Sequence, residues 1–445
     1  LSMTMASDTT DQPMYIEQGR KGKPEQNLLC NKFVNAQEDE NGVFQTTTGI
    51  VDGNRYAAEA LEKGCSYVVV DNSDFADEAN PQIILVDDSL CALQTLARHH
   101  RRTLGTPIVG ITGTNGKTTT KELVATVLKK KFNILYTQGN LNNHIGVPLT
   151  LLRLTREHEM AIVEMGANHI GDIKELVDIA EPDYGLITNV GLAHLQGFGS
   201  LEGVIQTKGE LYDYLRSTEH HTIFLNADNA YLRNISEGLE TVTYGQGENA
   251  FVCGKLVACD PYLRFQWKIG EGEWHAVATQ LIGSYNMDNA LCAATVGCYF
   301  GVPQEDISEA LAGYAPQNNR SQLTKTQHNM LVVDAYNANP TSMRAALDNF
   351  ARMEVPHKMA ILGDMKELGE ATSVAHQEVV DSIAMLGLGE VWLVGDAFAR
   401  TTHTQRAFAD VEAVKVALQE SMPKGYHILI KGSNSMKLAS LVPYL

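Results

Sequence analysis

A short run of glycine and small polar residues, Gly113-Thr-Asn-Gly-Lys-Thr-Thr119, carries the clearest chemical signal in the chain. The apolar run Pro107-Ile-Val109 precedes it, and a segment with helical character, residues 120–131, follows it. A strand, a tight glycine turn and a helix N-terminus direct backbone N–H groups at one point, where a polyphosphate binds. The first glycine of the general loop formula would fall at Ile111, so the match is incomplete. The run nevertheless predicts a nucleoside triphosphate site.

Two side chains in this run have specific roles in such a loop. Lys117 would reach the terminal phosphates, and the Thr118 hydroxyl would ligate the accompanying Mg²⁺. The alternative interpretation is a glycine-rich turn with a lysine on the surface.

Three further polar side chains follow candidate strands of the same section. Glu164 directly follows the apolar residues 161–163, His194 lies four residues after the strand that ends at Val190, and Lys208 lies further along. An open α/β sheet places its ligand site beyond the carboxyl ends of its strands. Glu164 is a suitable oxygen ligand for a Mg²⁺ that also contacts Thr118, and His194 could hold a second ion or orient a substrate. Alternatively, Glu164 is a carboxylate on the surface, and His194 and Lys208 are isolated side chains with no role in a site.

The pattern that positions these residues is α/β, and it divides the 445 residues into three domains. We expect an N-terminal α/β substrate domain over residues 1–104 and a central phosphate-loop domain with a doubly wound, mostly parallel sheet over residues 105–316. A Rossmann-like α/β domain is expected over residues 317–445. The expected strands of the two larger domains cover residues 108–111, 161–163, 185–190, 222–225, 330–333, 359–362, 391–394 and 427–430, with antiparallel hairpins between 250 and 282.

In the first domain we expect helices and strands in alternation. Residues 55–63 and 89–102 read as helices, and residues 67–70 and 83–86 read as strands. A further helix is expected in the central domain over residues 287–300.

Composition excludes several classes of function. The apolar content of 44% and the charged content of 20% are typical of a globular protein in water, and no window approaches the apolar length of a membrane span. The net charge of −18, with no basic stripe, argues against nucleic acid as a partner. The seven cysteines are scattered and form no Cys-x-x-Cys, which favours buried thiols in a reducing cytoplasm. We expect a cytoplasmic monomer.

The set of motifs resembles the Mur ligases of peptidoglycan synthesis over roughly residues 42–445. The later motifs resemble the branch of that family that joins D-alanyl-D-alanine to a UDP-linked muramoyl tripeptide. In chain order, the segments that carry the resemblance are Gly113–Thr119, Gly139–Pro148, Glu164–Asn168, Thr188–His194, Gly283–Ala290, Asp334–Met343, Leu362–Gly369 and Lys431–Ser433.

The resemblance implies an ATP-dependent, amide-forming ligase that works through an acyl phosphate with two Mg²⁺ ions. Lys117, Glu164, His194 and Lys208 would be catalytic, and Lys208 would be carbamylated by CO₂ into a carboxylate-like metal ligand. The implied metal ligands are Thr118, Glu164, His194 and Lys208. The implied ATP contacts are Gly113, Thr114, Asn115, Gly116, Lys117, Thr118, Thr119, Asn286, Asn289, Arg320 and Asp334.

The resemblance also implies contacts to the two substrates. Asn142 and Asn143 would lie near the muramoyl peptide, and Tyr336, Asn337 and Asn339 would face the incoming dipeptide. Asparagine and proline at 337–340 could instead form a turn, and Asn286 and Asn289 could instead cap a helix.

The first domain departs from the family pattern. The family's uridine-binding region has a Thr-Asp-Ser-Arg-like stretch, whereas this chain has Val34-Asn-Ala-Gln-Glu-Asp-Glu40. Either the uridine is held differently and more weakly in this chain, or residues 1–41 do not correspond to the family's N-terminal segment.

Two other functions fit parts of the pattern. A folylpolyglutamate synthase-like ligase would share the phosphate loop, but the segments Asp334–Met343 and Leu362–Gly369 weigh against it. A non-catalytic ATP-binding switch or scaffold would need neither a second metal nor a carbamate.

Overall fold

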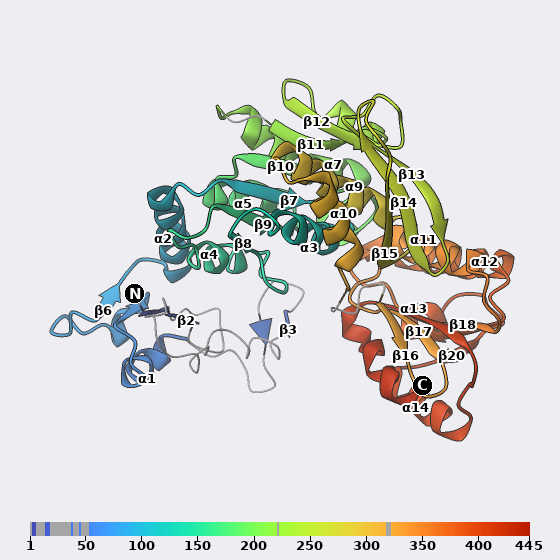
Figure 1. Ribbon diagram of the computed structural model, residues 1–445. Helices are drawn as coiled ribbons and strands as arrows, with labels where there is room; N and C mark the ends of the chain where they lie inside the picture. The colour runs from blue at the N-terminus through green and yellow to red at the C-terminus, as the bar shows by residue number, and fades with distance from the viewer. Residues whose placement is uncertain are drawn as a thin grey trace. The chain divides into compact units, whose positions relative to one another are not determined.

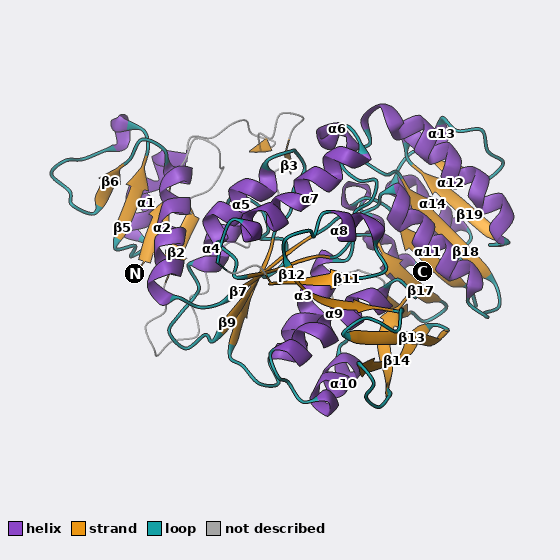
Figure 2. Cartoon of the chain, turned by 90° about the horizontal axis from the view of Figure 1, so that it is seen from above, coloured by secondary structure: helices purple, strands orange, loops and turns teal. Residues whose placement is uncertain are grey.

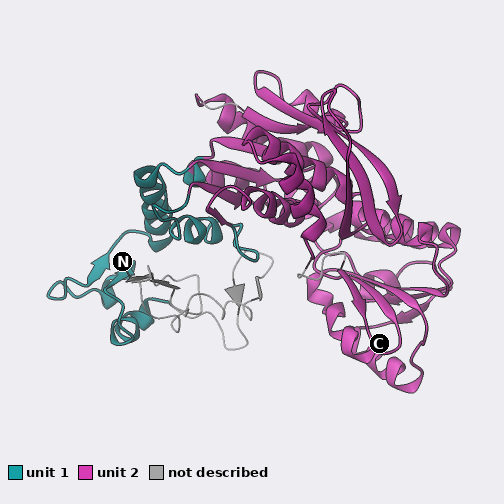
Figure 3. Cartoon of the chain, in the orientation of Figure 1, with its two compact units in different colours: residues 1–106, 137–158, 179–181 teal, residues 107–136, 159–178, 182–445 magenta. Residues whose placement is uncertain are grey.

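The computed structural model describes residues 53–219, 222–316 and 322–445, together with four short strands near the N-terminus. These strands are β1 (Ser2–Met5), β2 (Met14–Glu17), β3 (Gln37–Glu38) and β4 (Phe44–Gln45). The chain forms two compact units (Figure 3). Unit 1 contains residues 1–106, 137–158 and 179–181, and unit 2 contains residues 107–136, 159–178 and 182–445.

Unit 1 has a four-stranded sheet in the order β2-β1-β5-β6. Strands β5 (Tyr67–Val70) and β6 (Ile83–Leu85) are parallel to each other and to β1, whereas β2 is antiparallel to β1. The short helix α1 (Ala57–Glu62) packs its alanines against buried valines of β5. Helices α2 (Ser89–Leu104) and α4 (Gly146–Leu151) contact each other in the same unit.

The larger sheet of unit 2 has nine strands in the order β15-β14-β13-β12-β11-β10-β7-β9-β8 (Figure 1). Strands β7 to β13 are parallel, and β13, β14 and β15 form two antiparallel hairpins at one edge. The strands are β7 (Ile108–Thr112), β8 (Ile134–Tyr136), β9 (Met160–Glu164), β10 (Tyr184–Ile187), β11 (Thr222–Asn226), β12 (Glu240–Gly245), β13 (Val252–Cys259), β14 (Tyr262–Ile269) and β15 (His275–Ile282).

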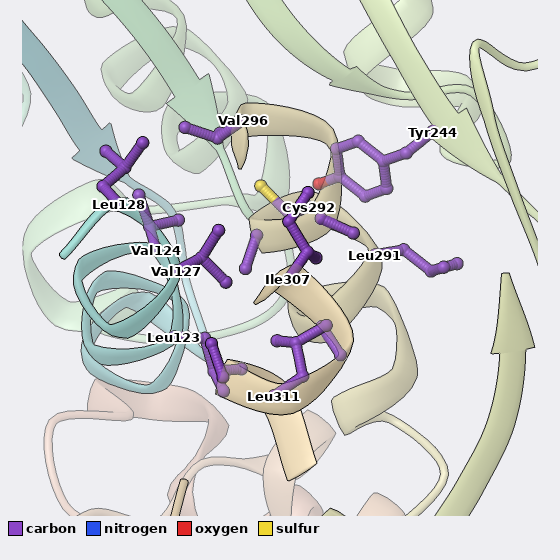
Figure 4. Packing of buried hydrophobic residues seen from close by; sticks show 14 of the residues in the cluster. Leu123, Val124, Val127, Leu128, Tyr244, Leu291, Cys292, Val296, Ile307 and Leu311 are labelled. Carbon is purple, nitrogen blue, oxygen red and sulfur yellow. The ribbon is translucent and has the colours of Figure 1, made fainter. Parts of the chain in front are cut away.

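Helices cover both faces of this sheet (Figure 2). On one face, α3 (Lys117–Leu128), α9 (Asn286–Tyr299) and α10 (Gln304–Gly313) pack together through fully buried leucine, valine and isoleucine side chains (Figure 4). Burying each such side chain stabilises the fold by about 1.5–3 kcal/mol. This packing fixes the direction of α3, the helix that follows the glycine-rich run. The remaining helices of this part are α5 (Asp172–Ala180), α6 (Leu195–Phe198), α7 (Leu201–Arg216) and α8 (Ala230–Asn234).

A second sheet of unit 2 has six strands in the order β16-β17-β21-β18-β19-β20, and all but β16 are parallel. Its strands are β16 (Gln322–Lys325), β17 (Met330–Asp334), β18 (Lys358–Gly363), β19 (Glu390–Val394), β20 (Arg406–Phe408) and β21 (His427–Lys431). Its helices are α11 (Pro340–Arg352), α12 (Thr372–Leu386), α13 (Asp396–Ala399) and α14 (Val411–Glu420). Two separate apolar clusters pack on the two faces of this sheet.

The sequence-based expectations of fold class and of a doubly wound central sheet are confirmed. The helix after the glycine-rich run begins at Lys117 rather than Thr120, because Gly116 turns directly into it at φ 78°. The strand expected at 185–190 ends at Ile187. Strands β8, β12, β16 and β20 were not predicted. The domain boundaries at 104/105 and 316/317 stay predictions. Within the described residues, no helix is both long and apolar enough to cross a bilayer.

Candidate active site

The glycine-rich run forms a tight loop between the end of β7 at Thr112 and the start of α3 at Lys117. Gly113 has φ 140° and Gly116 has φ 78°, in the region of backbone conformations that favours glycine. A Cβ atom on Gly113 would lie 2.1 Å from the Thr188 hydroxyl oxygen, so a side chain is also excluded by space. The loop therefore delivers the chain directly into a helix N-terminus, where free N–H groups and the helix dipole favour an anion.

Side chains that follow β10 hold this loop in place. The Asn189 carboxamide accepts from the Asn115 N–H (3.0 Å) and donates to the Asn115 carbonyl (3.0 Å). The Thr188 hydroxyl donates to the same carbonyl at 2.7 Å. Thr188 and Asn189 belong to a segment that carries the family resemblance, but no role was predicted for either residue. Their role here is to fix the backbone of the phosphate loop.

Lys117 is the first residue of α3, and its side chain folds back over the loop. Its Nζ donates to the Gly113 carbonyl (2.7 Å) and to the Thr114 carbonyl (3.2 Å). The ammonium is thus held next to the backbone that would surround a polyphosphate. The catalytic role of Lys117 stays a prediction.

Thr118 and Glu164 meet at the carboxyl ends of β7 and β9. The Thr118 hydroxyl donates to Glu164 Oε1 at 3.1 Å, and both side chains are buried. A hydroxyl and a carboxylate are hard oxygen donors of the kind that Mg²⁺ prefers. Among the residues that the structure describes, no group of three histidine, cysteine, aspartate or glutamate side chains could hold a metal. The residues present fit an Mg²⁺ that keeps further oxygen ligands from water or nucleotide.

Lys208 is buried on α7, where only 2% of the residue is exposed. Its Nζ lies 3.4 Å from the Ala167 carbonyl oxygen and 5.1 Å from the centre of the Phe198 ring. Burial, reinforced by the nearby Lys117 ammonium, holds the pKa of the Lys208 amine well below its usual range. Glu210, two residues after Lys208 on α7, accepts from the backbone N–H groups of Gly171 (2.9 Å) and Lys174 (2.8 Å).

His194 lies directly before α6 and contacts a residue from the second sheet's part of unit 2. Its Nδ1 lies 2.5 Å from Glu367 Oε2, and the Gln196 N–H donates to the Glu367 carbonyl at 3.3 Å. The hydrogen bond from His194 lowers the pKa of the Glu367 carboxyl. Both His194 (φ 49°) and Glu367 (φ 63°) have left-handed backbone conformations, which are costly for residues with side chains and cluster at functional sites. Glu367 was not predicted as a site residue, although its segment was.

Asn286 and Asn289 lie in the first turn of α9 and support the start of α3, the helix that follows the phosphate loop. The Asn289 carboxamide accepts from the Thr120 hydroxyl (3.0 Å) and donates to Asn286 Oδ1 (2.9 Å). Asn286 in turn donates to the Ile282 carbonyl at 2.8 Å. This chain of hydrogen bonds gives both residues a structural task. Their contact with adenine stays a prediction.

The predicted site residues beside the second sheet differ in their partners and in their exposure. Asp334 ends β17 and accepts from the buried Lys431 ammonium at 2.6 Å. Asn339 caps α11 by accepting from the Ser342 N–H, and its amide donates to Asn115 Oδ1 at 2.8 Å. Tyr336 is half-buried and Asn337 is exposed. The contact between Asn339 and the phosphate loop was not predicted.

Three predicted site residues cannot be joined to this cluster. Arg320 lies outside the residues that the structure describes. Asn142 and Asn143 belong to unit 1, where the Asn143 carboxamide oxygen accepts from the Ile145 and Gly146 N–H groups at the start of α4.

The fold and the loop define a phosphate-loop nucleotide-binding enzyme of the α/β class. Residues 111–297 match the Mur ligase middle domain, and residues 319–434 match the Mur ligase glutamate ligase domain. The UDP-N-acetylmuramoyl-tripeptide–D-alanyl-D-alanine ligase of Bacillus subtilis is 35% identical over 407 residues, 88% of this chain and 87% of the relative. The Escherichia coli ligase of the same name is 33% identical over 437 residues, 90% of this chain and 95% of the relative.

Solved structures give the same result. The crystal structure of MurF ligase from Thermotoga maritima in complex with ADP superposes with a TM-score of 0.78 at 26% identity, covering 92% of each chain. This chain belongs to the Mur ligase family, in the branch of the UDP-N-acetylmuramoyl-tripeptide–D-alanyl-D-alanine ligases. The resemblance identified from the sequence motifs is therefore confirmed.

Proposed function

We propose that this chain is an ATP-dependent ligase that joins D-alanyl-D-alanine to UDP-N-acetylmuramoyl tripeptide. A carboxylate oxygen of the tripeptide attacks the γ-phosphorus, the bond to the β-phosphate oxygen breaks, and ADP leaves. The amine of D-alanyl-D-alanine then attacks the acyl carbon, loses a proton and displaces phosphate. The observation that carries the proposal is the buried contact between Thr118 and Glu164 beside the phosphate loop, because phosphoryl transfer requires a metal at that place.

Lys117 and the loop amides would stabilise the charge that develops on the phosphoryl oxygens. Thr118 and Glu164 would hold one Mg²⁺, and His194 would hold a second. Bound Mg²⁺ supplies electrostatic stabilisation of the transferring phosphoryl group. The close contact of His194 Nδ1 with Glu367 Oε2 leaves Nε2 as the nitrogen available to a ligand.

Lys208 would act as a carbamate. Carbamylation joins the neutral amine nitrogen to the carbon of CO₂ and releases one proton, giving an anionic oxygen ligand for a metal. Two features support this: the described residues form no ion pair with Lys208, and burial lowers the pKa of the amine. Both favour the neutral form that reacts.

The other predicted residues are assigned to substrates. Asn286, Asn289, Arg320 and Asp334 would contact the adenosine part or the phosphates of ATP. Asn142 and Asn143 would contact the muramoyl peptide, and Tyr336, Asn337 and Asn339 would face the dipeptide. We infer three domains bounded as predicted, residues 1–104, 105–316 and 317–445.

We also propose a cytoplasmic monomer. The six cysteines within the described part of the chain are free thiols, which agrees with a reducing compartment.

Phosphate release tests the function directly. We expect release to require ATP, UDP-muramoyl tripeptide and D-alanyl-D-alanine together, with one new peptide bond per ADP. Release without any acceptor would support the nucleotide switch instead. Release that depends on a folate and glutamate would support the folylpolyglutamate synthase-like alternative.

A further inference from the structure

Lys121 is a buried lysine that takes part in no step of the proposed ligase reaction. It lies on α3 three residues after Thr118, so both side chains belong to neighbouring positions of the helix. Its side chain is 0% exposed, and its Nζ lies 3.0 Å from Glu122 Oε1 and 3.8 Å from Glu164 Oε2. A fully buried ammonium is costly unless carboxylates compensate its charge. The cost of burying this ammonium is therefore offset by its contacts with the two carboxylates.

The two oxygens of Glu164 face different partners. Oε1 accepts from the Thr118 hydroxyl at 3.1 Å, whereas Oε2 lies on the side of the Lys121 ammonium at 3.8 Å. Rotation of this buried carboxylate would exchange the two oxygens. The attraction between Oε2 and the ammonium opposes that rotation.

We propose that Lys121 is a positioning residue that orients Glu164 for metal binding. Lys121 retains Oε2, so that Glu164 presents Oε1 alone, next to the Thr118 hydroxyl, as a single-oxygen ligand. Mg²⁺ requires nearly regular octahedral geometry, and a carboxylate that binds through one fixed oxygen satisfies it. The inference rests on the proposed function, because that function places the ion at Thr118 and Glu164.

The test is direct metal binding by Lys121→Met in the full chain. Mn²⁺ replaces Mg²⁺ as a paramagnetic probe, titrated in the presence of the non-hydrolysable analogue β,γ-methylene-ATP. We expect Mn²⁺ to bind about 10–100-fold more weakly, the usual effect of losing a partner that orients a metal ligand. Binding of the analogue in EDTA should stay within about 2-fold. Turnover should recover at high Mg²⁺, with a raised KM for Mg²⁺ and a nearly unchanged kcat.

Glu122→Gln is the matched control. It removes the closer carboxylate of Lys121 but leaves the contact with Glu164, so the Mn²⁺ affinity should change by less than about 3-fold. Lys121→Gln retains a donor without the charge and replaces Lys121→Met in the titration if the latter does not fold. Its Mn²⁺ affinity should also fall by about 10-fold.

Two results would overturn the inference. The first is a folded Lys121→Met or Lys121→Gln protein that binds Mn²⁺ as wild type does. The second is an equal loss in Glu122→Gln, which would show that the loss does not depend on the contact between Lys121 and Glu164. Glu164→Gln separates this inference from the proposed function. If Glu164→Gln leaves Mn²⁺ binding intact, the metal placement itself is wrong, whereas a loss in Glu164→Gln without one in Lys121→Met rejects only the role of Lys121.

Discussion

Two buried lysines of the same unit, Lys121 and Lys208, have opposite surroundings. Lys121 lies between the carboxylates of Glu122 and Glu164, at 3.0 and 3.8 Å. Lys208 contacts a carbonyl oxygen at 3.4 Å and an aromatic ring, and forms no ion pair with the described residues. The difference shows how one residue type serves two purposes. A lysine between carboxylates is suited to remain a cation that orders its neighbours, and a lysine without them is prepared to react.

Lys431 extends the comparison. It is as buried as the other two, and its Nζ donates to Asp334 at 2.6 Å. Lys431 therefore belongs with Lys121, and Lys208 differs from both.

The largest effect is expected from Lys208→Ala. Loss of a metal ligand should lower kcat by about 10³-fold, because bound metal contributes several kcal/mol to transition-state stabilisation. Acetate should restore part of the activity, since it can occupy the vacated space as an anion. Glu210→Gln, at a neighbouring carboxylate already held by two backbone N–H groups, is the control and should retain most activity.

The carbamate itself can be observed. Wild-type protein in ¹³C-bicarbonate should show a carbamate resonance that is absent in Lys208→Ala. If wild-type enzyme is fully active in buffer freed of CO₂ and shows no carbamate signal, Lys208 is not carbamylated. It would then be an unreactive buried lysine like Lys121 and Lys431.

The next effect is that of Lys117→Ala. It should lower kcat by about 10²–10³-fold, the usual loss for one group that stabilises transition-state charge. The variant should fold normally, because Thr188 and Asn189 also hold the loop backbone that the ammonium contacts. The measurement is phosphate release at saturating substrates. Near-normal ligation by a folded variant would show that this lysine takes no part in the reaction.

A smaller effect is expected from Glu367→Gln. An amide can still accept from His194 but carries no charge, so kcat should fall by about 10-fold, the low end for a group that orients a metal-ligating histidine. Hydrogen exchange of residues 192–199 should increase, because a weaker side-chain contact with His194 loosens the attachment of this segment to residue 367. A change in exchange without a change in kcat would make this contact structural only.

Sequence alone predicted the parts of the site that are local. Gly113–Thr119 is recognisable because a strand, a glycine turn and a helix follow one another, and Glu164 because it ends an apolar strand. Lys121 and Glu367 could not be predicted, because each has its role through a partner far along the chain. At position 121, a helix pattern alone does not show that the ammonium is buried beside β9.

In the fold, too, features that are local in the sequence were predicted, and features that depend on distant partners were not. Long apolar strands such as β7 and β9 were predicted, whereas β8 has only three residues and β12 has a half-exposed pattern. Such strands are specified by the neighbours they pair with rather than by their own residues. The glycine-rich loop shows the same dependence, because Gly113 is required partly by the Thr188 side chain of another strand end.

The smallest effect is expected on the stability of Lys208→Met, measured by urea unfolding without CO₂. The exchange conserves volume and removes one long hydrogen bond, so the free energy of unfolding at neutral pH should change by less than about 1.5 kcal/mol. Lys431→Met should cost about 3 kcal/mol, because Asp334, 17% exposed, would lose its cation.

The dependence of stability on pH gives the sharper contrast for Lys208. The pKa of its amine is lowered on folding from 10.5, so between the folded-state pKa and 10.5 the unfolded chain binds more protons than the folded one. The contribution of Lys208 to the free energy of unfolding must therefore rise with pH across that window. It is lowest at pH values below the window. Wild type should gain stability relative to Lys208→Met as the pH rises towards 10.5. Parallel pH profiles for the two proteins would mean that Lys208 keeps its proton when buried, and it would then be no more prepared to react with CO₂ than Lys431.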